Sequence, residues 1–178
     1  MWRMILSAAI LACMAGCTPD QSAHPQPPAS EASKAASLSS QDRDFLERAA
    51  EGNNAEAAMG RVAQKNGASA AVIEYGRMMV ADHGAAQTRL AAIARQKSIA
   101  LPTSLGEHQA GFDRIVDLKG EDFDTEFMKV MVEDHHNAVL LYQSEASGGV
   151  DPPIVAYARE TLPKIRAHLE HAKALAPK

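Results

Sequence analysis

The chain has 178 residues, with 18 Lys and Arg against 22 Asp and Glu, which gives a formal charge of -4. This length is sufficient for one domain with a hydrophobic core, and the lack of a basic excess argues against a nucleic-acid-binding protein. Only 4% of the residues are aromatic, whereas Ala, Leu, Glu and Lys recur throughout, so the composition favours helices over sheets.

The first 16 residues have the features of a lipoprotein signal peptide. A positively charged start precedes an apolar run over residues 5–12, which is too short to span a bilayer. Met14-Ala15-Gly16-Cys17 resembles a bacterial lipobox, in which Cys17 is lipidated and becomes the mature N-terminus. Because Thr18 rather than Asp follows, we expect an outer-membrane anchor that faces the periplasm. The alternative is a plain cleaved signal peptide and a soluble periplasmic protein.

A polar segment separates this signal from the rest of the chain. Residues 17–39 are rich in Pro, Ser, Ala and Gln and contain few large apolar side chains. Such a composition cannot offset the entropy of ordering the chain, which is typical of a disordered tether. We therefore expect the folded domain over residues 40–178.

Capping and breaking signals divide this domain into helices. Ser104 and Glu107 have the spacing of a capping box and predict a short helix. Asp151-Pro152 predicts the start of the last helix, and Pro163 predicts a kink within it. Four long helices with short links predict an all-α fold, an antiparallel four-helix bundle with one short crossing helix. The expected helices cover residues 40–65, 69–97, 104–118, 121–146 and 152 onward.

A short phrase occurs twice in the predicted helices. Met79-Val80-Ala81-Asp82-His83 recurs as Met131-Val132-Glu133-Asp134-His135, near the centre of each helix. Two related helical hairpins would produce such a repeat, as in ferritin-like bundles. We therefore interpret the repeat as a trace of duplicated hairpins.

The helical periodicity places four metal-binding side chains on buried faces. His83, His135 and His168 share their faces with mostly apolar residues three, four and seven positions away, and so does Glu56. Each lies near the middle of its helix, and helix centres lie side by side in an antiparallel bundle. We therefore expect one layer of a carboxylate and three imidazoles, a donor set that suits copper, zinc or iron. Asp82 and Asp134 would accept imidazole N–H groups or serve as further ligands.

One other interpretation of the layer remains open. A hydrogen-bonded layer of Glu and His side chains would fix the register of the bundle without any metal. The protein would then be an interaction or envelope-stress module. A diiron oxidase is disfavoured, because Glu133-x-x-His136 is the only motif of its kind. No motif of a hydrolase or transferase is present, so the sequence does not indicate an enzyme.

Three segments of the chain resemble the bacterial family known as domain of unknown function 4142. They are MMVADHGAAQTRLAAIA, FDTEFMKVMVEDHHNAVLLY and ARETLPKIRAHLEHAKAL. The resemblance implies a ferritin-like bundle in the outer membrane or periplasm, and it implies no established activity. The family pattern is matched by Glu56, Asp82-His83, His135 and Leu162-Pro163 before His168. The doubled histidine departs from that pattern, so His136 is an alternate ligand on the third long helix.

Overall fold

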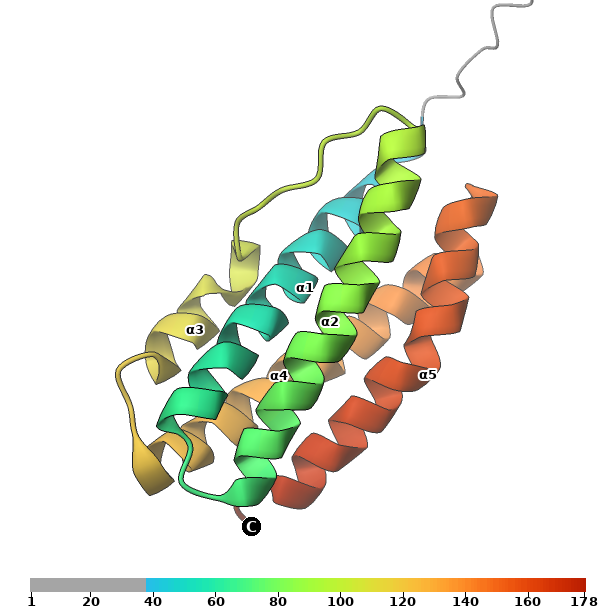
Figure 1. The fold of residues 1–178 in the computed structure, drawn as a ribbon. Helices are drawn as coiled ribbons and strands as arrows, with labels where there is room; N and C mark the ends of the chain where they lie inside the picture. Colours follow the sequence, from blue (N-terminus) through green and yellow to red (C-terminus); the bar gives the residue numbers. More distant parts are fainter. Residues whose placement is uncertain (1–37) are drawn as a thin grey trace, which may run out of the picture. The chain divides into compact units, whose positions relative to one another are not determined.

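The computed structural model describes residues 38–178, and all regular structure in this range is helical (Figure 1). The signal peptide, Cys17 and the tether up to residue 37 lie outside the described residues. Among the described helices, none has the length and apolarity needed to cross a membrane. The elements are α1 (Ser40–Asn66), α2 (Ala70–Gln96), the 3-10 helix η1 (Gly106–His108), α3 (Gln109–Ile115), α4 (Gly120–Gly148) and α5 (Pro152–Leu175).

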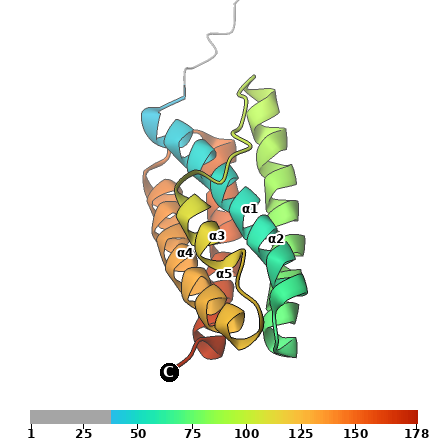
Figure 2. The ribbon, with the colours of Figure 1, turned by 90° about the vertical axis from the view of Figure 1, so that its left-hand side faces the viewer.

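The four long helices form an antiparallel bundle of two hairpins. The α1–α2 hairpin packs beside the α4–α5 hairpin, so that α1 also contacts α4 and α2 also contacts α5. The connection from α2 to α4 carries η1 and α3 along the side formed by α1 and α4 (Figures 1 and 2). This architecture confirms the predicted all-α bundle with a short crossing helix.

One aspartate in each hairpin accepts hydrogen bonds from the turn of the other hairpin. Asp124, near the start of α4, accepts hydrogen bonds from the backbone N–H groups of Ala68 (2.9 Å) and Ser69 (2.8 Å) in the first turn. Asp42, near the start of α1, accepts from the backbone N–H groups of residues 150 and 151 in the second turn. These bonds satisfy backbone groups that the helix ends leave open. They also fix the level at which the helices meet.

The crossing segment differs from its prediction. Instead of forming a capping box, Ser104 donates to the Glu51 carboxylate (2.9 Å) and Glu107 accepts from Arg48 (2.8 Å). The first residues of η1 and α3 therefore have no side-chain cap, and the helical turns cover only Gly106–Ile115. The capping-box prediction is wrong because both side chains bind α1 rather than their own backbone.

The repeated phrase lies in α2 and α4, and it does not mark duplicated hairpins. A duplication would match α1 with α4 and α2 with α5, whereas the phrase links the second helix of one hairpin with the first helix of the other. In the bundle α2 and α4 are diagonal partners that run in the same direction (Figure 1). The two copies therefore bring their histidines to the bundle axis from opposite sides.

A polar layer separates two hydrophobic clusters in the bundle. One cluster surrounds the α1–α2 turn and the other surrounds the α4–α5 turn. Helix α5 passes through both and is continuous across Pro163, although this residue cannot donate a helical hydrogen bond. The largest buried side chains include Met59, Tyr75, Phe123, Phe127 and Met131 in the first cluster, and Phe45, Leu46, Leu90 and Tyr157 in the second.

Candidate metal centre

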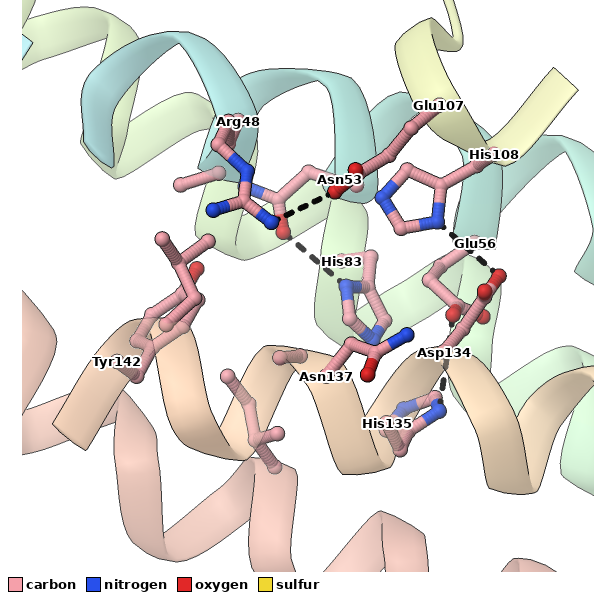
Figure 3. Close-up of a pocket in the computed structure, with 15 residues that line it drawn as sticks. Arg48, Asn53, Glu56, His83, Glu107, His108, Asp134, His135, Asn137 and Tyr142 are labelled. Atoms are coloured by element: carbon pink, nitrogen blue, oxygen red, sulfur yellow. Dashed lines mark hydrogen bonds and ion pairs between the residues drawn. The ribbon is translucent and has the colours of Figure 1, made fainter. Parts of the chain in front are cut away.

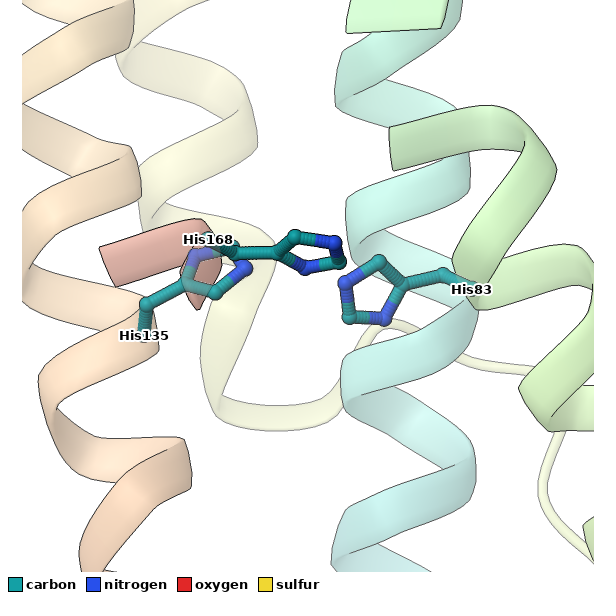
Figure 4. A group of neighbouring side chains, drawn as sticks. All are labelled: His83, His135 and His168. Atoms are coloured by element: carbon teal, nitrogen blue, oxygen red, sulfur yellow. The ribbon is translucent and has the colours of Figure 1, made fainter. Parts of the chain in front are cut away.

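Three histidines from three helices meet in the polar layer, as the predicted register required. His83 lies on α2, His135 on α4 and His168 on α5, and their exposed fractions are 8%, 1% and 3%. One ligand atom from each lies within 4.8 Å of the other two (Figure 4). The ring centroids are 5.4 to 5.6 Å apart. We call these three residues the histidine trio.

Each ring of the trio is held by a hydrogen bond that one of its two nitrogens donates to a neighbouring residue. We call this nitrogen the outer nitrogen and the other one the inner nitrogen. His83 Nδ1 donates to the Asn53 side-chain oxygen (3.1 Å), and His135 Nδ1 donates to the Met131 carbonyl (2.9 Å). His168 Nε2 donates to the Asp82 carboxylate (2.9 Å). All three partners are acceptors, so each outer nitrogen carries the proton and the opposite nitrogen carries a lone pair.

The inner nitrogens of the trio have no partner. Within the described part of the chain, His83 Nε2, His135 Nε2 and His168 Nδ1 are buried without a hydrogen bond. Burial holds the pKa of His83 well below its usual range and lowers the pKa of His135 to about 3. Burial also lowers the pKa of His168, although the Asp82 carboxylate opposes this effect. Three neutral imidazoles therefore present their lone pairs to one another, which is the form that binds metals.

Glu56 lies next to the trio but is not part of it. Its Oε1 atom is 3.6 Å from His135 Nδ1, which is the outer nitrogen of that ring. Its other oxygen is buried and, among the described residues, unpaired. Burial and the neighbouring Asp134 carboxylate raise the pKa of Glu56 well above its usual range. The structure thus places this predicted ligand in the layer, on the side of His135 that faces away from the trio nitrogens.

The two aspartates of the repeated phrase have different partners. Asp82 accepts from His168 and from Lys164 (2.8 Å), as a residue that orients an imidazole would. Although partial burial opposes it, these two hydrogen bonds lower the pKa of Asp82. Asp134 instead lies 3.1 Å from His108 Nδ1. His136, the alternate ligand, is exposed and lies outside the trio.

Two residues near the trio were not predicted. Asn53 orients His83, and its amide donates to Gln87 (3.2 Å) and Tyr157 (3.4 Å), which fixes the oxygen toward the imidazole. Its position three residues before Glu56 on one helix face was a usable signal. His108 lies on the crossing segment, and only 12% of its side chain is accessible, because it packs against α1 and lies beside Asp134 of α4 (Figure 3). The course of such a connection could not be predicted, because it lacks the regular helical repeat that shows which side chains are buried.

Fold and site together define a four-helix-bundle protein with a buried cluster of three histidines. Its sequence places it in a family: the model of the family described as Domain of unknown function (DUF4142) matches residues 27–175, and the chain belongs to this family. A search of curated proteins gave no significant match. Among solved structures, the chain is similar to "CopM in the Cu(II)-bound form", with a TM-score of 0.65 and 16% identity. The match covers 75% of this chain and 93% of the other, and at this identity it shows a shared fold.

Proposed function

We propose that this protein binds a transition metal ion in the core of its bundle through His83, His135 and His168. The observation that carries the proposal is a set of three neutral histidines, each with one buried and unpaired nitrogen, whose ligand atoms lie within 4.8 Å of one another. Imidazole nitrogens suit copper, zinc and iron, and their outer N–H groups are held here as metal-binding histidines usually are. A bound ion would supply the partner that each inner nitrogen lacks.

The competing interpretation is a polar layer that only fixes the bundle. Such a layer is stable when its members satisfy one another, since an unpaired buried polar atom costs about 1 to 3 kcal/mol. Here the hydrogen bonds run outward from the trio, and its centre is left without a donor. This arrangement favours a metal site over a purely structural network. Copper gains support from the structural neighbour CopM, whose similar structure is of a Cu(II)-bound form.

We further propose that the protein is anchored by lipid at Cys17 in the outer membrane and holds the domain in the periplasm. The support is the lipobox-like sequence Met14-Ala15-Gly16-Cys17 followed by the polar tether. Such an anchor would place the metal site in an oxidising compartment, where imidazole ligands persist and free thiols do not. Mass analysis of the N-terminal peptide from native membranes tests this: a lipid-modified Cys17 at the mature terminus is expected, and an unmodified mature terminus would contradict it.

The metal content of the full-length protein, isolated from its native envelope, tests the main proposal. Elemental mass spectrometry should find at least one equivalent of copper, zinc or iron per chain. The His83→Ala/His168→Ala variant should lose one equivalent. The matched control, His136→Ala/His171→Ala, removes two exposed histidines and should lose none. Protein that arrives without metal and takes up none of the three ions would overturn the proposal. The structural interpretation would then predict that the His83→Ala/His168→Ala variant melts at a lower temperature than the wild type and that chelators have no effect on melting.

A further inference from the structure

A second group of metal-ligating side chains lies next to the trio, on the other nitrogen of His135. Glu56, His108 and Asp134 come from α1, η1 and α4, and all three line one cavity of about 30 Å³ (Figure 3). A cavity needs only about 10 to 15 Å³ to hold a water-sized sphere. Within the described residues, Glu56 Oε2, His108 Nδ1 and Asp134 Oδ2 are buried atoms without a hydrogen-bond partner.

The contacts inside this group do not satisfy its charges. His108 Nδ1 and Asp134 Oδ2 are 3.1 Å apart, but they are not aligned as a hydrogen bond. Glu56 is only 4% exposed, and its closest basic atom is His135 Nδ1 at 3.6 Å. In the described part of the chain, the ion-pair partners of these two carboxylates are histidines alone, because Arg48 at the cavity wall is paired with Glu107. Although burial opposes this effect, Asp134 raises the pKa of His108, so Asp134 has a cationic partner. Within residues 38–178, Glu56 has only the neutral His135 as a basic partner, and its buried Oε2 atom is left without a partner.

We propose that Glu56, His108 and Asp134 bind a second divalent metal ion, separate from the ion of the histidine trio. Two carboxylate oxygens and one imidazole nitrogen form a donor set that suits zinc, iron or manganese. The ion supplies the partner that Glu56 Oε2, His108 Nδ1 and Asp134 Oδ2 lack among the described residues, and the small cavity leaves room for it. This site is distinct from the trio, because the trio uses Nε2 of His135 and Glu56 lies against Nδ1.

The second site also differs from the trio in its access to solvent. The side chains of His108 and Asp134 are 12% and 13% exposed, whereas His135 is almost completely enclosed at 1%. A ligand on the crossing segment gives the second ion a route that does not require the four long helices to separate. We therefore expect the second site to exchange its ion faster than the trio does.

Zinc stoichiometry of the full-length protein separates the two sites. After loading with Zn²⁺ and dialysis, the wild-type chain should hold two zinc ions. His108→Ala should halve the bound zinc, and so should His83→Ala/His168→Ala, while the combined variant should hold none. His136→Ala, which removes an exposed histidine next to His135, should retain both ions. Circular dichroism confirms the fold of each variant, and Asp134→Asn replaces His108→Ala if the latter does not fold.

Each failure has a different signature. A wild-type protein that binds one zinc, and loses it only when His83 and His168 are replaced, would refute the second site and leave the trio standing. One zinc that is lost only in His108→Ala would refute the trio and leave the second site. If His108→Ala and Asp134→Asn both retain all the zinc of the wild type, the cavity holds only water and the inference is wrong.

Discussion

The hydrogen bond from His168 to Asp82 allows the strength of the proposed metal site to be tested without removing a ligand. Asp82→Asn keeps a side chain of the same shape and an acceptor for His168 Nε2, but it removes the negative charge. A hydrogen bond to a charged acceptor contributes about 1.5 to 3 kcal/mol, against about 0.5 to 1.5 kcal/mol for a neutral one. These two ranges differ by about 1 to 1.5 kcal/mol. The bond length of 2.9 Å is that of a formed hydrogen bond, and the 25% exposure of the Asp82 side chain argues against a larger difference.

We therefore expect Asp82→Asn to weaken metal binding by about tenfold, or about 1.4 kcal/mol. A competition titration with a chromophoric zinc chelator near neutral pH measures the dissociation constant. Lys164→Gln is the matched control, because it removes the other partner of Asp82 and leaves the bond to His168 intact. Its affinity should be equal to or tighter than that of the wild type. An Asp82→Asn variant with unchanged affinity, or a Lys164→Gln variant that is weakened as much, would refute the reasoning.

Two further predictions concern stability. Burial and the neighbouring Asp42 raise the pKa of Glu145 to about 7 from 4.5, so the folded state binds the proton more tightly and stability should fall as pH rises between these values. Glu145→Gln should remove this decline and, after allowance for solvent screening, raise the free energy of unfolding above pH 7 by about 1 kcal/mol. Urea unfolding at about pH 5 and about pH 8 measures this, and a decline that is unchanged in the variant would contradict it. A Cβ on Gly60 would lie 2.6 Å from the Gly76 carbonyl, whereas one on the exposed Gly84 would meet nothing within 4 Å. Gly60→Ala should therefore lower the free energy of unfolding by about 1 to 3 kcal/mol, whereas Gly84→Ala should raise it by about 0.5 to 1 kcal/mol. Melting temperatures that shift in the same direction in both variants would contradict the close approach of α1 and α2.

The sequence was sufficient to predict the long helices, because their boundaries depend on local signals. Helix α1 was expected over residues 40–65 and spans Ser40–Asn66, and α5 begins at the predicted Pro152. Ser69 and Asp151 cap their helices through side-chain oxygens, which is a contact between residues three apart. The crossing segment was harder to predict, because Ser104 and Glu107 have partners on α1 that lie 53 and 59 residues away in the chain. Local rules cannot choose between a cap and a distant ion pair.

The meeting of the histidines could be predicted, whereas their hydrogen-bond partners could not. Helix periodicity and equal depth along the bundle were sufficient to bring His83, His135 and His168 to one level. The direction of Glu56, by contrast, depends on side-chain torsions and on the neighbouring Asp134, which periodicity does not describe. The same holds for Asn53, whose role follows from three side chains on two other helices.

The histidine trio joins the two hairpins of the bundle. His83 belongs to the α1–α2 hairpin, and His135 and His168 belong to the α4–α5 hairpin. Hairpins built from helices that are adjacent in sequence form early, because little chain entropy is lost in closing them. All three histidines can therefore bind one ion only after the hairpins have docked. An ion bound in this way would hold the two hairpins together. The rate at which the ion is released would then depend on how long the two hairpins stay docked. A substitution that weakens the docking would speed release even though the ligands are unchanged.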